Sequence, residues 1–152
     1  MKGWLFDTNV AAAVSSPTGA RSVKDWAASQ DEGRFFLSIL TIAEFDKGIA
    51  NLAEDDVDRA RHTAQRNSLE QRFAGRVLSL DDHIVRLWGE IAGRVKRETG
   101  HPPQVIDTLI AATAIRHSLY LVTRNVRDVS HSGAVVFNPW TDDPKDFPLL
   151  SG

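Results

Sequence analysis

Cysteine is absent from the 152 residues of this sequence. Disulfide bonds and thiolate metal sites are therefore excluded, as is typical of proteins in a reducing cytoplasm. The sequence also lacks an apolar run long enough to cross a bilayer, and its first residues lack the apolar region of a signal peptide. We therefore expect a cytoplasmic protein that is not bound to a membrane.

Charge of one sign is not in large excess either, because the net charge is only −2. A polycation that attracts nucleic acid through its overall field is excluded, so nucleic-acid binding would depend on local basic patches or on bound metal. The hydrophobic content of 42% and the charged content of 25% are ordinary for a globular protein. A chain of this length fits one domain with a sizeable core. We expect residues 1–152 to form that domain, with 138–152 as a polar tail of little regular structure.

Short apolar runs alternate with longer helical patterns along the chain. The apolar runs predict buried strands at 4–6, 35–38, 76–80, 119–123 and 134–137. Apolar residues at helical spacing predict helices at 10–14, 20–29, 40–52, 55–73, 82–97 and 105–117. Strands joined through helices make right-handed crossovers between parallel neighbours. The predicted fold class is therefore α/β, with three α/β/α layers around a central parallel sheet of about five strands.

The stretch from Gly3 to Asn9 puts a carboxylate at one edge of this predicted sheet. Asp7 ends the apolar run of the first strand, and Thr8 or Asn9 can cap the helix that follows. Ligands of open α/β sheets bind at the carboxyl ends of the strands, which is where Asp7 would lie. The alternative is that Asp7 only caps the helix.

Four further oxygen donors are predicted at the same edge of the sheet: Glu44, Asp107, Asn125 and Asp128. Carboxylates gathered there would repel one another unless a cation neutralised them. Oxygen donors without cysteine indicate a hard metal, Mg²⁺ or Mn²⁺, and such metals act on phosphate oxygens and activate water.

Each acid also has a purely structural interpretation. Asp107 can be a first-turn residue that interacts with the helix dipole. Glu44 can pair with Lys47 or Lys24 at the surface, and Asp128 can be a turn residue. The spacing of these acids leaves both interpretations open.

Four motifs occur together along the chain: Leu-Phe-Asp-Thr-Asn-Val at 5–10, Ser-Ile-Leu-Thr-Ile-Ala-Glu-Phe-Asp-Lys-Gly at 38–48, Ile-Asp-Thr-Leu-Ile-Ala-Ala-Thr-Ala at 106–114 and Leu-Val-Thr-Arg-Asn-Val-Arg-Asp at 121–128. With these motifs in this order, the chain resembles the PIN-domain family over almost its whole length. Within that family it is most similar to the VapC-type toxins, including the FitB-like branch. Phe-Asn-Pro-Trp at 137–140 is similar to an ending often found there.

The resemblance implies a metal-dependent ribonuclease that cuts RNA, often tRNA or rRNA, and that is held inactive by a VapB-type antitoxin. It also implies a homodimer. In the family, the acids that match Asp7, Glu44 and Asp107 hold the metal. Some members have a fourth acid where this chain has Asn125, and the nearest acid here is Asp128. Either Asn125 coordinates through its amide oxygen, or Asp128 takes part in catalysis through water.

Side chains beside the acids are candidates for contact with the RNA substrate. Thr8 and Asn9 can hydrogen-bond either to phosphate or to the ligating carboxylates, and Arg124 and Arg127 can hold RNA. His101 is a further candidate, although a histidine beside two prolines also fits an exposed loop. The implied reaction is hydrolysis by in-line attack on the scissile phosphate, with one or two metal ions.

Two rival functions fit parts of the sequence. A haloacid-dehalogenase-like phosphatase also has an Asp after its first strand, but it requires a second acid two residues later, where Asn9 stands. A non-catalytic PIN-like module that binds RNA or protein is the other rival, and the retained acids argue against it. For partner surfaces, we expect exposed apolar helix faces such as the one bearing Trp26. Gly48, one turn after Glu44, would let another backbone approach closely.

Overall fold

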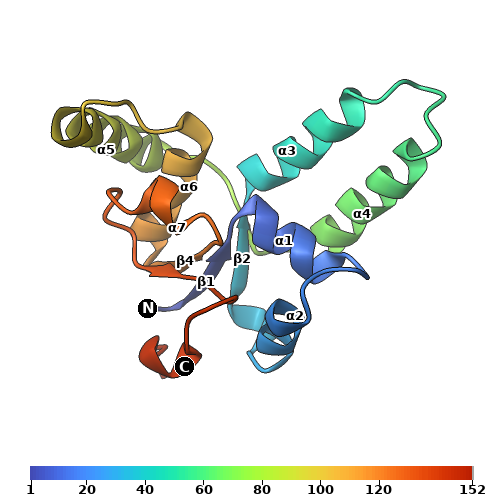
Figure 1. Cartoon of the computed structure of the whole chain (residues 1–152), viewed down its shortest axis with the longest axis horizontal. Coiled ribbons are helices and arrows are strands. Elements are labelled where there is room, and N and C mark those ends of the chain that lie inside the picture. The colour runs from blue at the N-terminus through green and yellow to red at the C-terminus, as the bar shows by residue number, and fades with distance from the viewer. Residues whose placement is uncertain (152) are drawn as a thin grey trace.

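The central element of the protein is a five-stranded parallel sheet with strand order β3-β2-β1-β4-β5, seen in a computed structural model that describes residues 1–151 (Figure 1). Its strands are β1 (Gly3–Phe6), β2 (Phe35–Ser38), β3 (Val77–Leu78), β4 (Leu119–Val122) and β5 (Val136–Phe137). In the register, Trp4 of β1 lies opposite Phe35 on one side and Tyr120 on the other. The predicted parallel sheet is confirmed, so the carboxyl ends of its strands share one edge.

Helices cover both faces of the sheet and give the predicted three-layer arrangement (Figure 1). One face carries α1 (Thr8–Ser15), α2 (Arg21–Ala28), α3 (Ile39–Ala50) and α4 (Arg59–Arg72). The other carries α5 (Asp82–Thr99), α6 (Val105–His117) and the single-turn α7 (Val126–Val129). Short 3₁₀ turns occur at Glu32–Arg34 and Pro144–Asp146. Within residues 1–151, no helix is both long and apolar enough to cross a membrane.

β1 is buried on both faces because successive side chains of a strand point to opposite sides. Trp4 and Phe6 enter an aromatic cluster with Trp26 and Phe35, in which the Trp4 and Trp26 ring centroids are 5.2 Å apart. Leu5 points the other way and belongs to the apolar cluster of α6. Double-sided burial explains why this strand is a continuous apolar run in the sequence.

The apolar face of α2 is not the partner surface that the sequence analysis expected. Trp26 is only 7% exposed, and Val23 is fully buried in the same cluster. The helical spacing correctly predicted an amphipathic helix, but its apolar side packs into the core of this chain. A partner must therefore use another surface.

Several element boundaries differ from the prediction. The polar helix begins at Arg59 rather than at residue 55, because Asp56 Oδ1 accepts from the Asp58 N–H (2.8 Å) and the Arg59 guanidinium donates to the Leu52 carbonyl (2.8 Å). These bonds hold residues 55–58 outside the helix. β3 and β5 are only two residues long, and both are edge strands that pair on one side only.

The segment after β5 has little regular structure but is attached to the core. Its residues Trp140, Phe147 and Leu149 pack against the aromatic cluster. The Tyr120 hydroxyl donates to the Pro148 carbonyl (2.8 Å), and the backbone N–H of Leu150 donates to the Met1 carbonyl (2.9 Å). These contacts, which no sequence pattern predicted, bring the two ends of the described chain together.

Candidate metal centre

Asp7 lies at the carboxyl end of β1 and caps α1. Its Oδ1 accepts from the Val10 N–H (3.1 Å), so Asp7 itself is the cap rather than Thr8 or Asn9. Its Oδ2 accepts from Asn9 Nδ2 (3.1 Å) and from the Thr123 hydroxyl, which follows β4. A carboxylate that only capped a helix would not need the last two donors, and they fix its orientation towards the sheet edge.

Burial raises the pKa of Asp7 from 3.8 to about 6, against the lowering effect of the hydrogen bonds from Thr123 and Val10. The negative charge of Asp107 raises it further. The carboxyl group is thus held in a position where its charged form is unfavourable. A cation beside it would reverse that penalty.

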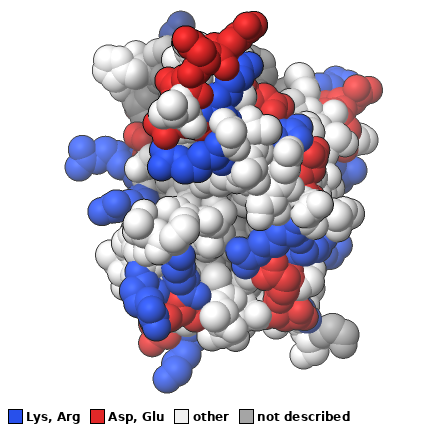
Figure 2. All heavy atoms as spheres, turned by 90° about the vertical axis from the view of Figure 1, so that its right-hand side faces the viewer, with Lys and Arg blue, Asp and Glu red and all other residues white. Residues whose placement is uncertain are grey.

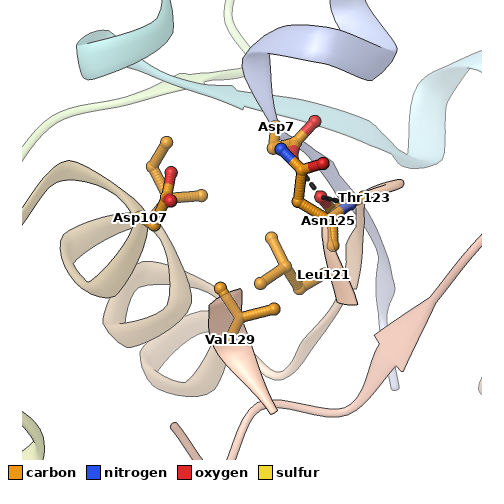
Figure 3. A pocket seen from close by; sticks show the side chains of 7 residues that line it. Asp7, Asp107, Leu121, Thr123, Asn125 and Val129 are labelled. Atoms are coloured by element: carbon orange, nitrogen blue, oxygen red, sulfur yellow. Dashed lines mark hydrogen bonds between the residues drawn. The ribbon is translucent and has the colours of Figure 1, made fainter. Parts of the chain in front are cut away.

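Asp107 lies in the first turn of α6 and faces Asp7 across a cavity of about 10 Å³ (Figure 3). That volume is about what one water molecule or one small ion requires. Burial raises the pKa of Asp107, and the charges of Asp128 and Glu44 raise it further. With its amide turned so that the nitrogen rather than the oxygen faces Asp107, Gln104 can donate to the carboxylate (3.1 Å to Oδ1). Besides Asp7 and Asp107, the cavity is lined by Ile110, Leu121, Thr123, Asn125 and Val129.

Asn125, and not Asp128, lines this cavity. Its side chain lies beside Asp7 in Figure 3, and its backbone N–H donates to the Thr123 hydroxyl (3.0 Å). Asp128 is exposed on α7 and lines a different hollow. Of the two possibilities left open by the sequence, direct contact with a small ion therefore fits Asn125, whereas Asp128 influences the site through its charge on Asp107.

Glu44 lies on the exposed side of α3, at the rim of the site. The Thr8 hydroxyl donates to Glu44 Oε1 (2.7 Å) and lies 3.3 Å from the Thr41 hydroxyl. The surface pairing of Glu44 with Lys24 or Lys47 is not seen among the ion pairs of residues 1–151. Glu44 instead lines a groove between α1, α3 and α4, and its charge still reaches Asp107.

The residues of the cavity fit a hard cation in their chemistry. Two carboxylates with raised pKa values face a gap of ionic size, and an amide oxygen is the third donor type available there. The four predicted acids do not form one compact cluster, however. Across the described chain, no three histidine, aspartate or glutamate side chains stand close enough together to form a metal-binding group. The structure thus brings Asp7 and Asp107 together and leaves Glu44 and Asp128 at the periphery.

The predicted substrate residues fall into two groups. Thr8 and Asn9 hydrogen-bond to carboxylates, Glu44 and Asp7 respectively, so they position the site. Arg124 and Arg127 are exposed beside it. The backbone N–H of Arg124 donates to Asn9 Oδ1 (3.4 Å).

Three contributors to the site were missed by sequence reasoning: Thr123, Gln104 and Trp140. Thr123 directly follows β4 as Asp7 directly follows β1. This equivalent position could have predicted that Thr123 lies at the same edge of the sheet as Asp7. Gln104 precedes α6 as its N-cap residue, where an amide side chain is unremarkable in a sequence. The Trp140 ring lies under the Arg124 guanidinium, 5.2 Å from its central carbon, and only the folded tail reveals this contact.

Comparisons with known proteins show what this chain is similar to. The family model described as PIN domain matches residues 4–130. The chain is 33% identical over 138 residues to Toxin FitB of Neisseria gonorrhoeae, covering 91% of this chain and 99% of the relative. It is 30% identical over 140 residues to VapC ribonuclease Y4jK of Sinorhizobium fredii, covering 90% and 96%. The crystal structure of FitAcB from Neisseria gonorrhoeae superposes with a TM-score of 0.79 at 32% identity, covering 90% of this chain and 98% of that chain.

Proposed function

This chain belongs to the PIN-domain family, and we propose that it is a metal-dependent endoribonuclease, the toxin of a VapBC-type toxin–antitoxin system, which hydrolyses phosphodiester bonds of RNA. The observation that carries the proposal is the pair Asp7 and Asp107, facing each other across a gap of about 10 Å³ at the sheet edge. One relative is named a VapC ribonuclease and another a toxin, which supports the substrate and the role.

In the proposed site, Asp7, Asp107 and the Asn125 amide oxygen would hold Mg²⁺ or Mn²⁺, with Glu44 at the rim. The ion would neutralise charge on the scissile phosphate and lower the pKa of a water molecule. Thr123 and Asn9 hold the Asp7 carboxylate, and Thr8 holds that of Glu44.

The apolar side chains at the cavity keep the site partly dry. Ile110, Leu121 and Val129 are buried and line the cavity with the two carboxylates. Electrostatic interactions there are stronger than in water because the surroundings are less polar. Arg124 and Arg127, exposed at the same edge, would bind phosphates of the RNA on either side of the cut.

The rival phosphatase function is disfavoured by what Asn9 does. A second acid at that position would be a catalytic group, but the Asn9 amide donates to Asp7 Oδ2 (3.1 Å) and so fixes the first one. A non-catalytic binding function does not explain why two partly buried carboxylates with raised pKa values line one small cavity.

For the antitoxin, the groove between α1, α3 and α4 replaces the α2 face as the proposed contact surface. It has a volume of about 240 Å³, is mostly apolar, and ends at Thr8 and Glu44. A Cβ atom added at Gly48 would meet nothing within 4 Å, so this part of the groove is open. Figure 2 shows Lys and Arg interspersed with Asp and Glu on the face that carries α3 and α4. A surface of mixed charge around an apolar groove suits a protein segment better than RNA.

Structural relatives support an antitoxin partner, since FitAB and VapBC complexes share this fold. A homodimer is the expected state of the free toxin. Light scattering of the purified chain, alone and with the protein from a neighbouring short reading frame, tests both assemblies. A strictly monomeric chain that binds no such protein and causes no growth defect would contradict these proposals.

The nuclease activity is tested by incubating the purified chain with total RNA and sequencing the product ends. We expect cleavage with Mg²⁺ or Mn²⁺ and none with EDTA. Asp107→Asn should abolish cleavage without unfolding the protein, because the amide keeps the volume but not the charge. Asp82→Asn is the matched control, since Asp82 occupies the first turn of α5 as Asp107 does in α6. Cleavage that persists in EDTA, or an active Asp107→Asn protein, would refute the proposed site.

A further inference from the structure

A second and much larger hollow lies next to the metal centre. It has a volume of about 570 Å³, which is within the range of ligand pockets. Its walls come from the end of α5, the loop before α6, the start of α6, and α7 with the residues that follow it. The lining includes Val95, His101, Pro102, Arg127, Asp128 and His131.

The helix α7 separates this hollow from the small cavity of the metal centre. Val129 of α7 faces the small cavity, whereas its neighbours Asp128 and Ser130 line the large hollow. On α6, Asp107 lines the small cavity and the next residue, Thr108, lines the large one. Neighbouring residues on α6 and around α7 thus line the two hollows, which therefore lie next to each other.

The walls of the hollow are fixed by hydrogen bonds. The Arg94 guanidinium donates to the carbonyls of His131 (2.9 Å) and Ser132 (3.1 Å). The Thr99 hydroxyl donates to the His101 carbonyl (3.0 Å) and accepts from the His101 N–H (3.3 Å). The backbone at His101 and His131 is therefore held in place by hydrogen bonds that do not involve either imidazole ring.

The side chains facing the hollow combine two kinds of chemistry. Ile91 and Val95 are buried, and together with Pro102 and Pro103 they offer an apolar surface on which a planar ring can lie. Arg127 carries a permanent positive charge and makes no ion pair within residues 1–151. His101 and His131 add ring N–H donors.

We propose that this hollow is a nucleotide subsite that binds the RNA residue next to the scissile phosphate, with the base on the proline side and the phosphate at Arg127. His101 and His131 donate to the phosphate or sugar oxygens. Asp128 accepts from an exocyclic amino group of the base, as carboxylates do in nucleic-acid recognition. This subsite rests on the proposed ribonuclease function for its role, but its affinity for a nucleotide is a separate property.

Nuclear magnetic resonance of the full chain in EDTA tests the binding, with cytidine 5′-monophosphate as the probe. The imidazole signals of His101 and His131 should shift in a saturable manner, while that of His83, exposed on α5, should not. Arg127→Ala should weaken binding roughly tenfold, because a charge-assisted hydrogen bond is lost. Arg116→Ala is the matched control, since Arg116 is an exposed arginine in the last turn of α6, and it should bind as the unmodified chain does.

Three results would overturn the subsite: no shift of either imidazole at millimolar probe, equal binding by Arg127→Ala, or equal binding of inorganic phosphate, which would show an anion site only. Cleavage with Mg²⁺ is measured separately on random-sequence RNA. There, Arg127→Ala should raise KM by about the same factor for every sequence, because a phosphate contact does not read the base. Nucleotide binding without any cleavage by the unmodified chain would refute the ribonuclease function and leave the nucleotide site standing.

Discussion

Asp7→Asn should make the metal-free protein more stable at neutral pH, although it removes a proposed catalytic group. The pKa of Asp7 is raised from 3.8 to about 6 in the folded state, mainly by burial. A carboxyl group whose pKa is raised by folding stabilises the fold fully at pH values below its pKa in the unfolded state. This contribution is lost as the pH rises through its pKa in the folded state. Above pH 6, the ionised carboxylate therefore lowers the free energy of unfolding by about 3 kcal/mol, at about 1.4 kcal/mol per pKa unit.

The amide introduced at position 7 keeps some of the native hydrogen bonds and loses others. Asn is as good an N-cap as Asp, so the bond from the Val10 N–H persists. An amide nitrogen in place of Oδ2 cannot accept from Asn9 Nδ2 or from the Thr123 hydroxyl. The hydroxyl can accept from the new amide instead, so the net loss is one hydrogen bond, about 1 kcal/mol. We expect a net gain of about 1–2 kcal/mol at pH 7.5, or roughly 3–8 °C in Tm for a chain of this size. At pH 4 the gain should vanish.

Urea unfolding in EDTA, followed by tryptophan fluorescence at several pH values, measures the difference between the two proteins. In the difference between their free energies of unfolding, the contributions of all groups that titrate equally in both proteins cancel. Asp81→Asn is the matched control, because Asp81 caps α5 through the Ile84 N–H (2.8 Å) in the same way but is exposed. A difference that does not change between pH 4 and pH 8, or an Asp7→Asn protein less stable than the control at pH 7.5, would refute this account of the site.

Three further predictions follow from single contacts. Thr123→Val removes a hydrogen bond that lowers the pKa of Asp7, so the midpoint of the pH-dependent loss of stability should move above pH 6 in the same urea assay. Trp140→Ala should raise KM for RNA with little effect on kcat, because the ring positions Arg124. Trp140→Phe should restore most of the loss. Equal KM values in the unmodified chain and both variants would show that the contact is incidental. Gly48→Ala should raise the free energy of unfolding by about 0.5–1 kcal/mol in a melting experiment, since the helix gains a better former and the added Cβ meets nothing within 4 Å.

The sheet and half of the site were predictable because they follow from local rules. A five-strand parallel sheet follows from apolar runs separated by helical spacing, and β1 shows it most clearly because both of its faces are buried. Once β1 and α6 are placed, Asp7 and Asp107 must lie at the edge where strands end. Their meeting across one cavity therefore needed no more than the order of the elements.

The rest depended on rotations and long-range contacts that no local rule determines. Asn125 and Asp128 are three residues apart, and the turn of α7 decides which of them faces Asp7. Trp26 has the spacing of an amphipathic helix whether its apolar side meets the core or a partner, so only the packed structure shows it buried. The contact of Trp140 with Arg124 depends on how the tail turns back, where Asn138 Oδ1 accepts from the Trp140 N–H (2.9 Å).

The hydrogen bonds around Asp7 connect stability with the proposed function. Thr123 is buried behind β4 and Asn9 is on α1, so both donors stay in place whether or not a cation is present. They hold a carboxylate facing Asp107 although burial and the second negative charge disfavour its ionised form. In the proposed site, a cation that entered the gap would remove both penalties at once, and the free energy lost by the metal-free fold would become part of the affinity for the ion. The arrangement would therefore weaken the metal-free protein for the same reason that it would favour Mg²⁺ or Mn²⁺.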